Sequence, residues 1–177
     1  VLDDLGIFPS VNLLYQITEQ QNLRASFTQT IARPSFKELS YAEIYDPITG
    51  ITFIGGFHPD GDDLEGVEYW DGNLISTDIQ NFDLRWEWFG TRGQMISLSG
   101  FYKLFKNPIE IVQYTKQVGA FQPRNVGDGQ ARGMEFELRQ SMGFMSESLQ
   151  ALRINLNLTY NSSSIQMSET EYESRVD

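Results

Sequence analysis

Hydrophobic and polar residues alternate along much of the chain with a period of two, which is the period of a β-strand rather than of a helix. The clearest segment is 81–88, where Phe82, Leu84, Trp86 and Trp88 alternate with Asn81, Asp83, Arg85 and Glu87. Three other segments, 23–32, 134–139 and 152–161, alternate in the same way, and two more, 11–18 and 95–106, do so less regularly. The pattern predicts six strands, at about residues 7–17, 22–34, 79–89, 94–106, 131–144 and 150–165.

The predicted connections alternate between short and long ones. Short polar turns pair the strands into three hairpins, whereas residues 35–78 and 107–130 form two long connections. Compact domains usually have loops of about 4–6 residues, but outer-membrane barrels have short turns at one end and long extracellular loops at the other. Strands of roughly 9–11 residues suffice to cross a bilayer. An all-β fold is predicted, as part of an antiparallel up-and-down transmembrane β-barrel; a soluble β-sandwich stays open as the alternative.

The amino-acid composition excludes several kinds of partner and of catalytic or metal site. The 177 residues carry 13 Lys and Arg against 24 Asp and Glu, a formal charge of −11, which argues against nucleic acid or anionic lipid as the main partner. The chain has no cysteine and one histidine, His58, so thiolate catalysis and Cys-based zinc sites are excluded. We find no catalytic constellation, and expect neither an enzyme nor a bound cofactor or metal. The mean hydropathy of −0.34 is typical of alternating barrel strands.

Four landmarks then carry a resemblance, the second of which joins Gly72-Asn73-Leu74 to the strand that follows it. The run Ala32-Arg33-Pro34-Ser35-Phe36-Lys37-Glu38-Leu39 ends a predicted strand, and Gly72-Asn73-Leu74 precedes the next. The strand 81–87 follows, then 96–103 with Asn107-Pro108, and last Asn125-Val126-Gly127 leading into 133–138. In this order they resemble the barrel of TonB-dependent outer-membrane receptors, of a Bacteroidetes type. Leu74 stands where that family usually has proline.

The resemblance implies that residues 1–177 are one segment of a larger barrel, because such transporters have about 22 strands and a plugged lumen. The plug domain and the remaining strands would lie outside this chain. The implied location is the outer membrane of a Gram-negative bacterium. The implied partners are outer-membrane lipid, the plug and the other strands, the TonB energy-coupling complex acting through the plug, and a possible surface lipoprotein.

The implied function is binding and import of a scarce extracellular solute, whether an iron chelate, an oligosaccharide or a peptide. A receptor or adhesin that does not transport remains an alternative, beside the soluble binding module.

Three sets of residues become candidates under this hypothesis. Lipid would meet the face of Leu84, Trp86, Leu156 and Leu158, with Tyr15, Trp88 and Phe89 at its interface. The opposite face would line the lumen and contact the plug, or pair across strands, through Arg24, Asp83, Arg85, Glu87, Glu135, Glu137, Arg139 and Arg153. Aromatic residues of the first long connection would contact the ligand, or form that loop's own cluster: Tyr41, Tyr45, Phe57, Tyr69 and Trp70.

The acidic run 60–66 lacks the spacing of a calcium-binding EF-hand, and a solvated turn is the favoured interpretation. His58 beside it is interpreted as a surface loop residue.

Overall fold

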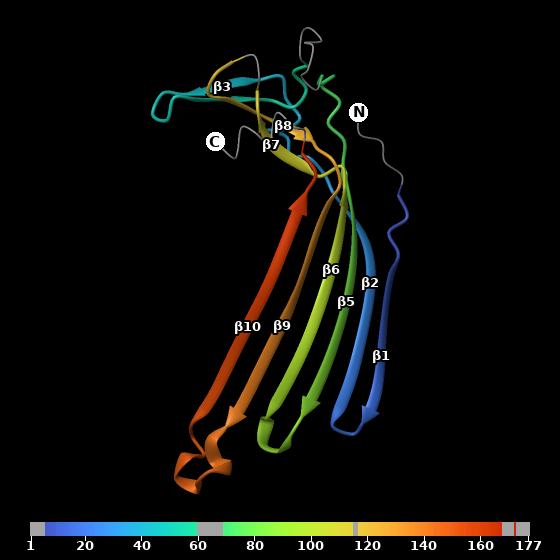
Figure 1. Ribbon diagram of the computed structural model, residues 1–177, viewed down its shortest axis with the longest axis vertical. Helices are drawn as coiled ribbons and strands as arrows, with labels where there is room; N and C mark the ends of the chain where they lie inside the picture. Colours follow the sequence, from blue (N-terminus) through green and yellow to red (C-terminus); the bar gives the residue numbers. More distant parts are fainter. Residues whose placement is uncertain (1–5, 60–68, 115–116, 168–171, 173–177) are drawn as a thin grey trace.

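Six long strands form one antiparallel sheet in the computed structural model, which describes residues 6–59, 69–114, 117–167 and 172 (Figure 1). They are β1 (Ser10–Thr18), β2 (Gln21–Ala32), β5 (Thr77–Phe89), β6 (Met95–Lys106), β9 (Gly129–Ser141) and β10 (Arg153–Ile165). Their order in the sheet is β1-β2-β5-β6-β9-β10, an up-and-down arrangement of three hairpins. The predicted fold, part of an antiparallel barrel wall, is confirmed, and each predicted boundary lies within three residues of the observed one.

The register sorts the side chains of this sheet onto two faces. One row runs Tyr15, Leu23, Trp86, Leu98, Phe136 and Leu158, and the next, on the other face, runs Leu14, Arg24, Arg85, Ser99, Glu135 and Thr159. Because successive side chains of a strand point to opposite sides, rows like the first form an apolar face and rows like the second a polar face. We use these two names below.

The apolar face is open. Leu13, Leu84 and Leu158 are 66%, 53% and 56% exposed, and they share this face with the other apolar rows. A soluble sandwich needs these side chains as its core, packed about 10 Å from a second sheet. Within the described residues nothing covers them, so the sandwich alternative lacks its core.

One interfacial assignment from the sequence is wrong. Phe89 lies in register with Met95, which in turn faces Arg139, so Phe89 belongs to the polar face. Trp88 and Tyr15 lie on the apolar face near the short turns, where they were expected. The error arises because adjacent residues such as Trp88 and Phe89 cannot share a face of one strand.

The short connections are tight. Thr18 and Gln21 face each other across the first turn, where the register shifts. Short 3₁₀ turns complete the other two hairpins: η1 (Thr91–Gly93), and η2 (Met142–Phe144) with η3 (Glu147–Leu149).

The two long connections fold together into a second sheet, which the sequence did not predict. Its strands are β3 (Glu43–Asp46), β4 (Ile51–Ile54), β7 (Ile109–Gln113) and β8 (Ala120–Asn125), in the order β3-β4-β8-β7. It lies at the end of the long strands opposite the short turns (Figure 1). The parallel pair β4–β8 joins the first connection to the second, and buried Ile54, Tyr114 and Ala120 form the core of this unit.

The β3–β4 turn has a local explanation. Gly50 has a φ of 72°, a conformation that glycine adopts without strain, and its amide donates to the Asp46 carbonyl at 2.9 Å. The Ile48 amide and the Thr49 hydroxyl donate to the Asp46 carboxylate at 2.9 and 2.8 Å. These two bonds hold the pKa of Asp46 below its usual value.

Candidate functional site

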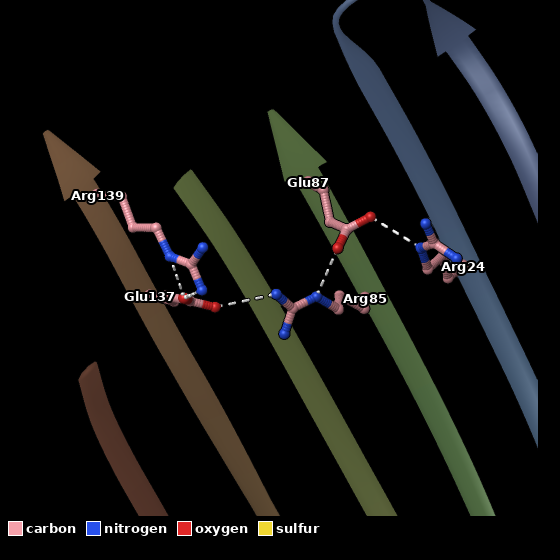
Figure 2. Close-up of polar contacts among 5 residues, drawn as sticks. All are labelled: Arg24, Arg85, Glu87, Glu137 and Arg139. Atoms are coloured by element: carbon pink, nitrogen blue, oxygen red, sulfur yellow. Dashed lines mark hydrogen bonds and ion pairs between the residues drawn. The ribbon is translucent and has the colours of Figure 1, made fainter. Parts of the chain in front are cut away.

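A chain of five ion-paired side chains crosses the polar face close to the short turns (Figure 2). Arg24 Nε and Arg85 Nε both donate to the Glu87 carboxylate, at 2.8 and 2.9 Å. Arg85 Nη2 also donates to Glu137 at 3.1 Å, and Arg139 Nη2 contacts the other Glu137 oxygen at 2.7 Å. We call Arg24, Glu87, Arg85, Glu137 and Arg139 the charged ladder.

The register explains why these charges alternate in space. Arg24 lies directly opposite Arg85, an arrangement that would be repulsive alone. Glu87 lies two residues nearer the turn, on the same face, and accepts from both arginines diagonally, so it separates their positive charges. Glu137, in the same row as Glu87, repeats this role between Arg85 and Arg139.

The small side chains of two serines on β6 leave room for the ion pair between Arg85 and Glu137, which lie on the strands at either side. Ser97 and Ser99 occupy the polar face of that strand between β5 and β9, and Arg85 reaches over them to Glu137. Ser97 is 1% exposed, and both hydroxyl oxygens are buried without a hydrogen-bond partner among the described residues. A larger side chain at either position would stand in the path of Arg85. The sequence showed only that both serines belong to the polar face; it did not show that their small size matters.

The inner members of the ladder are shielded and the outer ones are exposed. The side chains of Glu87 and Glu137 are 10% and 20% exposed, whereas those of Arg24 and Arg139 are 52% and 57% exposed. A carboxylate withdrawn from water needs its partners, because losing one leaves a costly unpaired charge. Exposed ion pairs contribute at most about 1 kcal/mol. Each glutamate has two arginine partners, and Glu87 is the more deeply buried of the two, so it is the member on which the ladder depends most.

The remaining candidates of the polar face lie around the ladder. Asp83 accepts a hydrogen bond from Ser26 at 3.2 Å. Glu135 shares the row of Arg85 and Ser99. Arg153 lies opposite Ser141, at the turn end of β10, and lines a shallow hollow together with Glu137 and Arg139. The structure thus joins five of the eight predicted residues through direct ion pairs and leaves these three beside them.

The five aromatic candidates of the first long connection are arranged in three ways. Tyr41 and Phe57 are in ring contact, with centroids 5.7 Å apart, and Tyr45 and Tyr69 are exposed. Trp70 instead points inward, and its Nε1 donates to the Gly56 carbonyl at 2.7 Å. The structure does not bring the five together into one cluster.

The sequence did not identify the polar residues that are buried in the second sheet. Gln122 is fully buried, and its Nε2 donates to the carbonyls of Gly55 and His58 at 3.0 and 2.7 Å. Its Oε1 accepts from Arg124 Nε at 2.8 Å, and the Arg124 guanidinium lies 5.7 Å from the Trp70 ring centroid. Buried polar groups must be satisfied, so these contacts fix one connection against the other.

His58 lies in the same unit, with Nε2 3.3 Å from Glu43. No group of three or more His, Asp or Glu within the described residues could hold a metal ion. The acidic run 60–66 lies outside the described residues. No helix among the described parts of the chain is both long and apolar enough to cross a membrane.

A comparison with models of protein families agrees with this barrel architecture. A family model described as TonB dependent receptor-like, beta-barrel matches residues 2–177. Among curated proteins the sequence finds no match.

A comparison with solved structures finds receptors with a similar fold. The siderophore receptor PirA of Pseudomonas aeruginosa has a TM-score of 0.63 at 18% identity, over 89% of this chain and 25% of that one. A mutant of the ferric enterobactin receptor PfeA, from the same organism, has a TM-score of 0.58 at 20% identity, over 87% of this chain and 21% of that one. This chain therefore spans about a quarter of the length of the structures that it matches.

Proposed function

The chain belongs to the TonB-dependent receptor-like β-barrel family, and from this premise we propose that it forms one sector of the wall of an outer-membrane receptor. The complete receptor binds a scarce extracellular solute and imports it, using energy that the TonB complex transmits through a plug domain. A plug and further strands complete the barrel, because an open sheet would leave the edges of β1 and β10 unpaired in lipid. No catalytic reaction is part of this proposal.

The observation that carries the proposal is the exposed apolar face. A sheet with one apolar and one charged face, and strands of 9 to 13 residues, suits a wall between lipid and a wet lumen. The second sheet then lies outside the cell, because long connections of such barrels are extracellular and short turns periplasmic.

The charged ladder would face the lumen near the periplasmic end. Its carboxylates are already paired within the wall, so its first role is to tie β2, β5 and β9 together. Its exposed ends, Arg24 and Arg139, are the groups left to bind acidic or carbonyl groups of the plug. The ladder's excess of one positive charge, three arginines against two glutamates, favours such contacts.

The second sheet is the proposed ligand-facing part. Tyr41, Tyr45 and Tyr69 are 70%, 62% and 50% exposed, and exposed rings can stack on sugar rings or on planar chelates. Trp70 supports the loop from within and is the weakest ligand contact of the five candidates. The solute belongs to one of three classes, an iron chelate, an oligosaccharide or a peptide; the names of the structural neighbours make a ferric chelate the first to test. A surface lipoprotein is a further possible partner on this side.

Uptake of labelled probes by cells tests the proposal. The full-length protein is expressed in a host that lacks its own receptors, and the probes are a ferric catecholate, a glucose oligosaccharide and a short peptide. We expect one probe to accumulate, and to do so only when both the receptor and TonB are present. Binding of a probe without accumulation would identify a receptor or adhesin that does not transport. Neither binding nor accumulation of any probe by a correctly surface-exposed protein would contradict the proposal.

A further inference from the structure

The second sheet is attached to the long sheet at one junction. Its core of Ile54, Tyr114 and Ala120 lies within the second sheet itself and does not reach the wall. Four stretches of chain join the two sheets: 33–42, 55–76, 107–108 and 126–128. The orientation of the second sheet on the wall therefore depends on how these four stretches are held together.

The side chain of Asn125, the last residue of β8, ties three of these stretches together. Its Oδ1 accepts from the Ile75 amide at 2.8 Å, and its Nδ2 donates to the Ile75 carbonyl at 3.0 Å. The same Nδ2 donates to the Asn107 carbonyl at 2.7 Å. One carboxamide thus holds both backbone groups of one stretch and a carbonyl of another, while Asn125 itself adjoins the third.

Backbone contacts complete the junction. The Val126 amide donates to the Pro108 carbonyl at 2.9 Å. The Gly56 amide donates to the Glu38 carbonyl at 2.7 Å, which brings in the fourth stretch. Leu74 is 2% exposed, and a Cβ added at Gly56 would lie 3.0 Å from Leu74 Cδ2 and 2.9 Å from the Glu38 carbonyl oxygen. The junction is therefore closely packed, and each of the four sequence landmarks contributes to it.

A carboxamide suits this position because of its hydrogen-bonding groups. Its NH₂ group supplies two donors and its oxygen supplies an acceptor, whereas an ionised carboxylate of the same shape only accepts. In Asn125→Asp, a carboxylate oxygen would face the carbonyls of Ile75 and Asn107 in place of the two donated hydrogen bonds. The bond from the Ile75 amide would remain. This substitution therefore opposes the junction without changing the size of the side chain.

We propose that Asn125 is the positioning residue of the second sheet, and that its carboxamide holds this sheet at one orientation on the wall. The second sheet is then a fixed platform for the solute and not a lid that swings over it. Rings that are held in place before binding lose less conformational freedom when a solute binds. This inference rests on the proposed function, which makes the second sheet the ligand-facing part.

The distance between two spin labels in the full-length receptor tests this inference. After removal of any other cysteine, labelled cysteines replace Ile48, which is 93% exposed in the β3–β4 turn, and Tyr160, which is 72% exposed on β10. Pulsed electron spin resonance then measures the distribution of distances in a bilayer. We expect one narrow distance when Asn125 is present, and a broader or shifted distribution in Asn125→Asp.

The matched control is Asn107→Asp, the same chemical change at the same junction. Asn107 contributes its backbone carbonyl, which accepts from Thr77 and Asn125. Its φ of 50° suits aspartate as well as asparagine. The distribution of distances should therefore stay narrow in this variant.

Hydrogen exchange gives the size of the effect. Asn125→Asp is expected to speed exchange at the Val126 and Gly56 amides about tenfold, which corresponds to about 1.4 kcal/mol of junction stability. Exchange at Leu98, within β6, should not change in either variant. Unchanged exchange at Val126 and Gly56 would contradict the inference.

Three spin-label results would overturn the inference: a broad distribution when Asn125 is present, an unchanged distribution in Asn125→Asp, or an equal change in Asn107→Asp. Loss of heat-modifiable gel migration in Asn125→Asp would overturn it as well, because the residue would then be needed to fold the wall itself. No solute takes part in these measurements. Their failure is therefore separate from failure of the proposed function, which the uptake of labelled probes tests.

Discussion

Replacing Leu158 with arginine is expected to destabilise the full-length barrel in a bilayer by about 2–4 kcal/mol, the cost of an arginine facing lipid at the membrane midplane. Leu158 is 56% exposed on the apolar face, in the central row with Trp86, Leu98 and Phe136. Thr159→Arg is the matched control, because the next residue of the same strand points to the polar face, in the row of Glu135. Urea unfolding in lipid vesicles measures both variants.

The control should change the free energy of unfolding by less than about 1 kcal/mol, since a lumenal arginine stays in contact with water and with carboxylates. Equal losses in the two variants would contradict the assignment of faces. A larger loss for Thr159→Arg would reverse that assignment.

Glu87→Gln should have the second largest effect, a loss of about 2 kcal/mol in the free energy of unfolding of the full-length protein. The substitution keeps the shape of the side chain but removes the charge that separates Arg24 from Arg85. Loss of one partner from a fully buried pair costs about 3–5 kcal/mol, and we expect less here because the Arg24 side chain is 52% exposed.

The control for Glu87→Gln is Glu135→Gln on the same face. Glu135 is exposed and lies in the row of Arg85 and Ser99, and its change should stay within about 0.5 kcal/mol. Urea unfolding of both variants provides the comparison. If Glu87→Gln proved as mild as Glu135→Gln, the ladder would be an ordinary set of surface ion pairs.

The long sheet could be predicted from the sequence because its signal is local. Alternation over 81–88 identifies a strand and its two faces without knowledge of any neighbour. The charged residues of the ladder were found in this way as members of one face. Their pairing was not, because it depends on the register of β2 against β5 and of β5 and β9 against β6, which alternation along a single strand does not fix.

The second sheet could not be predicted because its signal is not local. β3 and β4 have four residues each, too few for a reliable alternation, and β4 pairs in parallel with β8 from a different connection. Gln122 looks like an ordinary loop glutamine in the sequence, and only the contact of the two connections buries it.

Spin-label accessibility along β10 tests the central claim most directly, that the apolar face meets lipid. Single cysteines replace Leu156, Asn157, Leu158 and Thr159 in the full-length protein after removal of any other cysteine, and each carries a nitroxide label in a bilayer. Labels at Leu156 and Leu158 should be accessible to oxygen, which concentrates in lipid. Labels at Asn157 and Thr159 should be accessible to a water-soluble nickel complex. If the plug covers these two positions, their labels should be accessible to neither reagent. Labels at Leu156 and Leu158 that are shielded from both reagents would place these residues in a protein core and contradict the claim.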